Sequence, residues 1–465
     1  MFGMTIQRGV TIGRERPAWA RTALVAVNLG VVTFFLLNFS GHRIGFLPYR
    51  IDLDVYRIAS RVWLDGGNLY GPLPPTASGA RLPFSYPPVA AVLLSPLALV
   101  PMTVANTLLT LLSAGLTAVV LRVFLVAAWP AAGRSAGMAG WRTVGWLLPA
   151  AVMLEPVRNT INYGQVNVLL MVLVAADCLV PGRRWPRGAL VGLAAAVKLT
   201  PAAFVLFFLL RRDWRAARTA AGSFCFAAAA GFALAWRDSV RYWTSVVFQS
   251  GRPGNPAYAA NQSVEAVLTR AGLAPHSPAG LGLWLAASAV VVLLACIGMR
   301  RALDRSRGAG ADRNRGWDAW ALSLNAFAAL LVSPVSWSHH WVWGETAMLV
   351  LACLSLREQR PAGRRAGLSL AAAGTVLFAV SPQWWFPSAG NRGLHWPWWE
   401  QLAGSSYVIL AVTVLLAAAV ARRRPRPAAE EPAPVRPARD KHLRGELAPS
   451  ASACDRLGTD GLAVP

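Results

Sequence analysis

The chain has 465 residues, of which 55% are hydrophobic and only 14% are charged, and its formal net charge is +24. Soluble domains carry about 25% charged residues, so this composition excludes a large soluble enzyme and indicates an integral membrane protein. The positive charge does not indicate a nucleic-acid partner, because the arginines fall in short clusters between apolar segments, as in cytoplasmic loops of membrane proteins. The five cysteines have no spacing typical of a metal site or a disulfide framework.

Apolar segments that could cross a membrane, or nearly so, recur along the chain. The first follows an arginine-containing N-terminus and is predicted to be an uncleaved span, with residues 1–21 in the cytoplasm. Residues 22–421 are expected to form one all-α polytopic domain with about 10–12 membrane helices. Residues 422–465, rich in Pro, Ala and Arg, are predicted to be a disordered cytoplasmic tail. The apolar segments fall at 22–40, 88–128, 144–156, 166–181, 216–236, 281–299, 317–333, 342–356, 366–381 and 403–421. The segment 88–128 is expected to supply one full span and a short helix ahead of Pro101.

The arginine clusters between these segments predict the topology, because they face the cytoplasm by the positive-inside rule. The protein is then a multi-pass protein of the cytoplasmic membrane with both termini inside. Two long outer loops also contain several arginines, which agrees with the rule less well, although long loops translocate largely regardless of charge. The parts expected outside are residues 41–87, 157–165, 237–280, 334–341 and 382–402.

The segment 188–210 has a basic cluster at each end, so both ends should face the cytoplasm. Twenty-three residues are too few for two crossings, which need about 20 residues each. A re-entrant hairpin of two half-helices, broken at Lys198-Leu-Thr200-Pro201, satisfies both conditions, because Pro201 cannot continue the hydrogen-bond ladder. Lys198, one of two lysines in the chain, would lie at the hairpin turn. The alternative is an ordinary kinked helix whose lysine snorkels to the membrane surface.

The first outer loop, "YRIDLDVYRIASRVWLDGGNLYG", is predicted to contain a helix lying along the membrane interface. Its polar residues Asp52, Asp54, Tyr56 and Arg57 are candidate site residues. The two aspartates have a simpler interpretation as a helix cap and a solvated charge.

Three further polar motifs also fall on the predicted outer side of the membrane, like the first outer loop. Each has a simpler interpretation: Glu155 and Arg158 could pair with each other, the amides could cap helices, and the histidines could fill the interface. The shared side of the membrane favours a functional interpretation instead. The candidate residues in these motifs are Glu155, Arg158, Asn162, Gln165, Asn167, Asn261, Gln262, Trp337, His339 and His340.

This set of residues suits sugar transfer. Amides and carboxylates bind sugar hydroxyls, and a carboxylate can act as general base on an incoming hydroxyl. A lysine or an imidazolium can stabilise a phosphate leaving group, for which Lys198, His339 and His340 are the candidates. Because nucleotide sugars are absent outside the cytoplasmic membrane, the donor would be a sugar on a polyprenyl phosphate, and the acceptor a glycolipid or glycan of the cell envelope.

Six pieces of the chain resemble the bacterial polyprenol-phosphate-mannose-dependent α-1,2-mannosyltransferases, glycosyltransferase family 87, which have the GT-C membrane fold. Their order and spacing run from about residue 50 to residue 345. The pieces are "IDLDVYRIASRVWLDGGNLYG", "FSYPPVAAVLLSPLALVP", "NYGQVNVLLMVLVAAD", "GLAAAVKLTPAAFVLFFLLRR", "ANQSVEAVLTR" and "SPVSWSHHWVW".

The resemblance implies an inverting transferase that uses neither a metal nor another cofactor and forms an α-mannoside. It makes Asp52 the catalytic base, with the departing polyprenyl phosphate stabilised by Lys198 and by His339 or His340. The second carboxylate, Asp54, leaves open a swapped role or a bound divalent cation.

Three other interpretations remain open at this stage. A non-catalytic membrane scaffold is one, but it would leave Asp52, the histidines and Lys198 without a shared purpose. A transporter or flippase of lipid-linked sugars would use Lys198 as a charge in its pathway, but it predicts polar residues at several depths and a repeat symmetry, neither of which is visible in the sequence. Within the enzyme interpretation, the donor could carry another lipid-linked sugar.

Overall fold

The computed structural model describes residues 18–421, apart from 38–40, 45–46, 130–137, 250–251, 253, 276, 308–310 and 389–390. The expected cytoplasmic tail, 422–465, and most of the expected N-terminal segment, 1–21, lie outside the described residues. The described part is helical except for one short antiparallel pair of strands, β1 (Arg43–Ile44) and β2 (Leu47–Pro48).

Five helices of the described part are long and apolar enough to cross a membrane, and a sixth crossing is possible if the bent pair of α18 (Trp398–Gly404) and α19 (Ser406–Val420) counts as one. The two members of that pair meet at 66°. The prediction of an all-α integral membrane protein is therefore confirmed, and the number of spans stays a prediction. The five helices are α1 (Ala18–Leu36), α4 (Met102–Ala128), α11 (Trp214–Leu234), α14 (Pro278–Arg307) and α17 (Pro361–Val380).

The remaining helices are shorter, or carry more charge. The α-helices are α2 (Ile51–Leu64), α3 (Pro88–Leu99), α6 (Met138–Met153), α7 (Glu155–Tyr163), α8 (Asn167–Leu179), α9 (Ala189–Val197), α10 (Val205–Arg211), α12 (Trp236–Thr244), α13 (Val264–Arg270), α15 (Ala311–Val332) and α16 (Trp343–Leu356). The 3-10 helices are η1 (Thr200–Phe204), η2 (Val246–Phe248), η3 (Ser338–His340), η4 (Pro382–Trp384) and η5 (Arg392–His395).

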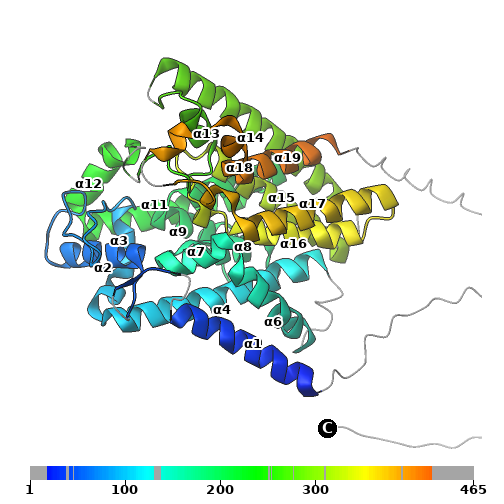
Figure 1. The fold of residues 1–465 in the computed structure, drawn as a ribbon, viewed down its shortest axis with the longest axis horizontal. Helices are drawn as coiled ribbons and strands as arrows, with labels where there is room; N and C mark the ends of the chain where they lie inside the picture. Colours follow the sequence, from blue (N-terminus) through cyan, green and yellow to red (C-terminus); the bar gives the residue numbers. More distant parts are fainter. Residues whose placement is uncertain are drawn as a thin grey trace, which may run out of the picture. The chain divides into compact units, whose positions relative to one another are not determined.

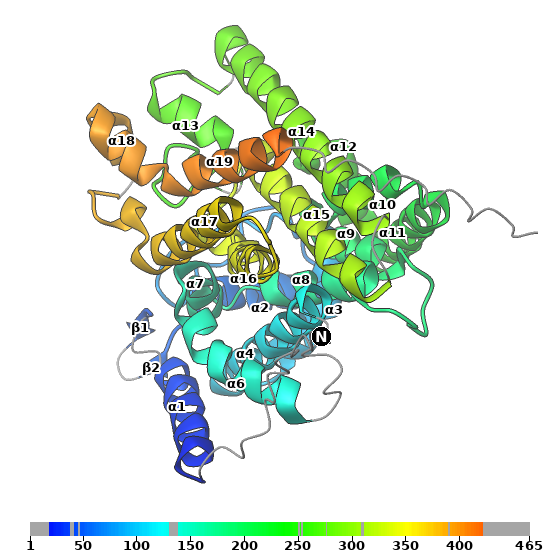
Figure 2. The same ribbon diagram turned by 90° about the vertical axis from the view of Figure 1, so that its right-hand side faces the viewer.

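The core forms where α4, α8, α15 and α16 pack against one another (Figures 1 and 2). Large aromatic side chains fill it, among them Phe124, Phe327 and Trp341. The long apolar segment 88–128 is divided as its prolines predict: Pro101 precedes the first residue of α4, and α3 ends at Leu99. Proline lacks the N–H that a continuous helix needs at this position.

The helix predicted in the first outer loop is α2, which packs against α3. Arg50, immediately before it, is 1% exposed. Its guanidinium donates hydrogen bonds to the carbonyl oxygens of Phe35 and Ile161 and to Thr110 Oγ1. The start of α2 is therefore held against α1, α4 and α7.

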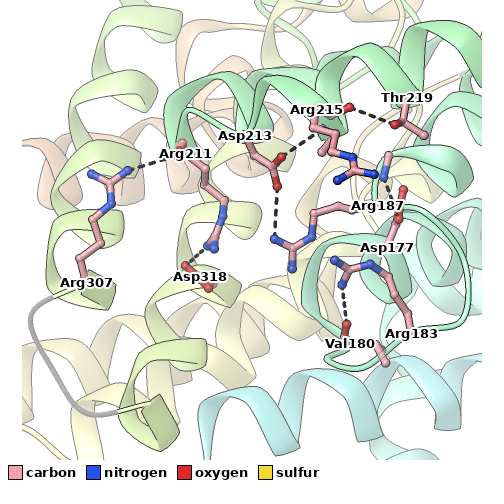
Figure 3. Close-up of polar contacts among 12 residues, drawn as sticks. Asp177, Val180, Arg183, Arg187, Arg211, Asp213, Arg215, Thr219, Arg307 and Asp318 are labelled. Carbon is pink, nitrogen blue, oxygen red and sulfur yellow. Dashed lines mark hydrogen bonds and ion pairs between the residues drawn. The ribbon is translucent and has the colours of Figure 1, made fainter.

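The segment 188–211 enters the bundle and returns, as predicted from its basic flanks. Helix α9 ends at Lys198, whose backbone is extended at φ −149° and ψ 129°, and η1 with α10 leads the chain back. Arg187, before the segment, forms an ion pair of 3.5 Å with Asp213, after it (Figure 3). The two ends of the hairpin therefore lie side by side, with Lys198 at the turn between them.

Basic side chains gather at this same end of the hairpin (Figure 3). Arg211 pairs with Asp318, and Arg307 donates to the carbonyl oxygen of Arg211. These contacts bring the end of α10, the end of α14 and the start of α15 together, as expected if the basic clusters share one side of the membrane.

Two glycines allow α9 to approach α11 closely. Gly188 has φ +98°, which favours glycine, and a Cβ there would lie 2.0 Å from the carbonyl oxygen of Ala216. A Cβ on Gly192 would lie 2.2 Å from the carbonyl oxygen of Ala220. The two backbones are therefore in contact, as is common between small residues of membrane helices.

We expect Gly192→Ala to destabilise the protein by about 1–3 kcal/mol, because the methyl group forces α9 away from α11. Gly222→Ala in α11 is the matched control, since nothing lies within 4 Å of its Cβ position. Thermal unfolding of both purified variants in detergent checks this expectation. Equal melting temperatures for the two variants would contradict the close packing of α9 on α11.

Candidate functional site

A cavity of about 330 Å³ lies where α2, the turn of the hairpin and the loop before η3 meet. We call it the Asp52 cavity. It combines one carboxylate with two cations, two amides, a histidine and several aromatic rings. The lining residues of these kinds are Asp52, Tyr56, Tyr86, Gln165, Lys198, Tyr242, Gln249, Arg252, Trp337 and His340.

Asp52 lies in the first turn of α2. The surrounding protein shields its carboxylate from water, which raises the pKa to about 6, while the hydrogen bond from Gln165 and the charge of Lys198 lower it in part. A carboxylate with this pKa is a stronger base than an ordinary aspartate and is still ionised at neutral pH.

Gln165 orients the Asp52 carboxylate. Its Nε2 donates a hydrogen bond of 2.8 Å to Asp52 Oδ2. Its Oε1 accepts hydrogen bonds from the hydroxyl groups of Tyr56, at 2.7 Å, and Tyr86, at 3.1 Å. Because two donors occupy the oxygen of the amide, the nitrogen must face the aspartate.

Lys198 projects from the hairpin turn into the same cavity. Its Nζ donates a hydrogen bond of 3.1 Å to Asn167 Oδ1 and lies 3.2 Å from His340 Nε2. It also lies 5.2 Å from the centre of the Tyr86 ring, within the range of a cation–π interaction. The groups that contact the ammonium at these distances are therefore neutral.

The two predicted histidines have different positions. His340 lines the Asp52 cavity, and burial together with the nearby Lys198 charge lowers its pKa well below the usual value. It is neutral and accepts from the ammonium through Nε2, so Nδ1 carries the proton. His339 is buried against Tyr163, and neither of its ring nitrogens has a partner in the described part of the chain. His339 is not among the residues that line the Asp52 cavity.

The backbone of His339 contributes to the site instead. Its carbonyl oxygen accepts hydrogen bonds from Thr160 Oγ1, at 2.7 Å, and from Asn167 Nδ2, at 2.8 Å. Asn167 thus connects η3 to Lys198, because its amide nitrogen donates to His339 and its amide oxygen accepts from Lys198.

Glu155 was predicted to contact substrate, but it is completely buried and bound by other side chains. It accepts hydrogen bonds from Asn159, Ser338, Trp384 and Tyr407 at 2.6–2.8 Å. These donors belong to α7, η3, η4 and α19. Glu155 therefore joins four elements at the back of the site rather than lining the cavity.

Other predicted contacts also serve the framework. Asp54 accepts from the Tyr49 hydroxyl and from the backbone N–H of Ala77. Arg57 donates to the carbonyl oxygens of Leu97 and Val100 at the end of α3. Neither lines the Asp52 cavity.

Asn261 and Gln262 support the loop that carries Trp337. Asn261 Oδ1 accepts from the backbone N–H of Ser336 at 2.9 Å, and the N–H of Gln262 donates to the Ser336 carbonyl oxygen at 2.8 Å. Asn162 lines a different cavity, described below, and Arg158 is half-buried and lines neither.

The lining residues that the sequence did not single out include Tyr86 and Arg252. Arg252 donates to the carbonyl oxygens of Phe84, at 3.2 Å, and Tyr70, at 3.1 Å, so its guanidinium has a defined position. Arg252 lies in a long outer loop, where nothing in the neighbouring sequence indicates a binding site. Tyr86 precedes a pair of prolines, which indicates only a turn. Within the described residues, no group of three or more metal-ligating side chains is found.

Comparison with known proteins finds one matching family model and several relatives. The model of glycosyltransferase family 87 matches residues 84–334. A polyprenol-phosphate-mannose-dependent alpha-(1-2)-phosphatidylinositol mannoside mannosyltransferase from Mycobacterium tuberculosis H37Rv is 41% identical over 419 residues, which is 88% of this chain and 92% of the relative. Its Mycolicibacterium smegmatis counterpart is 40% identical, with 85% and 91% covered. A pentamannoside mannosyltransferase from M. tuberculosis CDC 1551 is 34% identical, with 78% and 80% covered. No solved structure matches the chain.

The hydrogen bonds of Glu155 predict a structural effect of mutation. Hydrogen bonds to a charged group contribute about 1.5–3 kcal/mol each, and an amide cannot accept from all four donors. We therefore expect Glu155→Gln to lower the free energy of unfolding by about 3 kcal/mol or more. Thermal unfolding checks this, with the exposed Asp65→Asn as control. A Glu155→Gln variant as stable as the wild type would favour the substrate contact that the sequence predicted.

Proposed function

The chain belongs to glycosyltransferase family 87, and we propose that it transfers mannose from polyprenyl-phosphate mannose to a hydroxyl group of a phosphatidylinositol mannoside. Both mycobacterial relatives of highest identity given above carry this donor and this acceptor in their names. The observation that supports the proposal most strongly is that Asp52 and Lys198 line one cavity.

Lys198 is the proposed contact of the donor phosphate. The departing group of the reaction is a polyprenyl phosphate, which gains negative charge as its bond to the sugar breaks. A charge-assisted hydrogen bond from an ammonium stabilises that charge strongly in a site shielded from water. Arg252, the second cation that lines the cavity, is a further candidate for this contact.

His340 is assigned a different role from the one expected from the sequence. Since its pKa is lowered, it is neutral and cannot supply a second positive charge. Its Nε2 holds the Lys198 ammonium in place, and Asn167 Oδ1 does the same from another direction. His339 acts through its backbone alone.

Asp52 is the proposed general base. The acceptor oxygen attacks the anomeric carbon while its proton passes to the Asp52 carboxylate. The bond from the anomeric carbon to the phosphate oxygen breaks, and the phosphate leaves with the electron pair. Attack from the side opposite the phosphate inverts the configuration, so that a β-linked donor yields an α-mannoside, the linkage named for the relatives.

The reaction is proposed to take place on the outer side of the cytoplasmic membrane. The arginines at the open end of the hairpin (Figure 3) indicate the cytoplasmic side. Lys198 lies at the opposite end of α9. Sealed vesicles of known orientation distinguish the two sides, because an acceptor added from outside reaches the site in right-side-out vesicles only.

We expect Asp52→Asn to lower the rate of mannose transfer about 10²–10⁴-fold, the usual contribution of a general base. The wild-type rate should rise about tenfold per pH unit below pH 6 and level off above it, because only the ionised carboxylate accepts a proton. Transfer from labelled polyprenyl-phosphate mannose measures both, with and without a chelator, which should have no effect.

Asp54→Asn tests the alternative base, although the Asp54 carboxylate lines no part of the Asp52 cavity. The exposed Asp65→Asn is the control for both variants. Similar rates for the wild type and Asp52→Asn, with a loss in Asp54→Asn, would transfer the role of base to Asp54.

Replacement of Lys198 by Met should raise the KM for the donor about 10–100-fold, the effect of losing one hydrogen bond from a charged group. The KM for the acceptor should change little. Lys441→Met, which alters the only other lysine, is the control. An unchanged donor KM in Lys198→Met would rule out the proposed phosphate contact.

A further inference from the structure

A second cavity, of about 400 Å³, borders the first turn of α2 and the end of α7. Its volume lies within the range of about 300–1,000 Å³ found for ligand pockets. The lining residues that bear on its chemistry are His42, Tyr49, Ile51, Ser78, Asn159, Asn162 and Tyr163. We call it the Tyr163 cavity.

This cavity lies next to the catalytic one. Ile51 lines the Tyr163 cavity, and its neighbour Asp52 lines the Asp52 cavity. At the end of α7, Tyr163 lines the Tyr163 cavity and Gln165 lines the Asp52 cavity, with Gly164 between them. The first turn of α2 and the end of α7 therefore border both cavities.

The lining of the Tyr163 cavity indicates the class of its ligand. Two phenol rings, two amides, one hydroxyl group and the imidazole of His42 line it, and the described lining residues include no Lys, Arg, Asp or Glu. Lysine and arginine, which bind phosphate groups strongly, line the Asp52 cavity and not this one. Aromatic faces and amides instead suit a neutral ring with several hydroxyl groups.

Parts of this lining are also held in place. Asn159 Nδ2 donates a hydrogen bond of 2.7 Å to the buried Glu155, which orients the amide. The Tyr49 hydroxyl donates to Asp54 Oδ2 at 3.1 Å. The carboxylates of Glu155 and Asp54, which the sequence suggested as direct contacts, thus position residues of the second cavity.

We propose that the Tyr163 cavity is the acceptor subsite, and that it binds a mannosyl ring of the acceptor so that a hydroxyl group of the sugar reaches Asp52. The proposal rests on the proposed function, since it assumes a mannosylated acceptor. The donor occupies the Asp52 cavity, the acceptor sugar occupies the Tyr163 cavity, and the two meet at the boundary formed by α2 and α7.

Kinetics of two tryptophan variants test the subsite. Ser78→Trp fills the cavity and should raise the acceptor KM at least about tenfold, with the donor KM unchanged, because only acceptor binding is blocked. Ala77→Trp places the same side chain on the same exposed turn but outside the cavity, and should leave both values unchanged. An unchanged acceptor KM in Ser78→Trp would overturn the proposal.

Cysteine labelling provides a second test that does not depend on turnover. The Ser78→Cys variant is treated with a maleimide, and labelling at residue 78 is followed by peptide mass spectrometry. Short-chain phosphatidylinositol mannoside should slow labelling at least about threefold at saturation, and phosphatidylinositol without mannose should not. Equal protection by both lipids would overturn the assignment to the sugar.

Absence of protection by either lipid would overturn the subsite itself. In that case mannose transfer by the wild-type protein in the same membranes would leave the proposed function standing. Absence of transfer by the wild type would instead contradict the proposed function, and the two failures are therefore distinguishable.

Discussion

The positive charge of Lys198, at the turn of a hairpin within an apolar bundle, is the constraint on which the site depends. A charge in such a place is costly unless polar partners surround it. The break between α9 and η1 frees the side chain from the helix, and Asn167 and His340 supply the acceptors. The hairpin exists in this form because Gly188 and Gly192 let its first half lie directly on α11. Close packing of α9 on α11 near the start of the hairpin thus helps to hold Lys198 in position at its turn.

The helices α7 and α8 and the turn between them carry the groups that position the other residues of the site around Lys198. Thr160 and Asn167 bind the carbonyl oxygen of His339, and Glu155 binds Ser338, so η3 is held from both sides. Gln165, between the two helices, fixes the Asp52 carboxylate. A short stretch of chain therefore positions the base, the cation and the neutral histidine. Such preorganisation is what electrostatic stabilisation of a transition state requires.

The sequence predicted those features that depend on local patterns. The hairpin followed from Lys198, Pro201 and the flanking arginines, and the division of the segment 88–128 followed from its prolines. The polar groups were expected on one side, and the structure brings Asp52, Gln165, Lys198 and His340 to one cavity. The roles of Glu155 and Arg57 could not be predicted, because their partners are distant in the chain: 183 residues for Ser338 and 252 for Tyr407 in the first case, 40 for Leu97 in the second. The position of Arg252 in the Asp52 cavity was not predicted for the same reason, because only the fold brings its loop to Asp52.

The central claim is that Lys198 binds the donor phosphate in the cavity where Asp52 faces the anomeric carbon. A structure of the protein bound to a non-transferable phosphonate analogue of polyprenyl-phosphate mannose tests it most directly. The account predicts a phosphonate oxygen about 2.7–2.9 Å from Lys198 Nζ, the usual length of such a bond, and the mannose ring between Lys198 and Asp52. A phosphonate bound instead at the arginine cluster of Arg187 and Arg211, or a mannose ring outside the Asp52 cavity, would contradict the account.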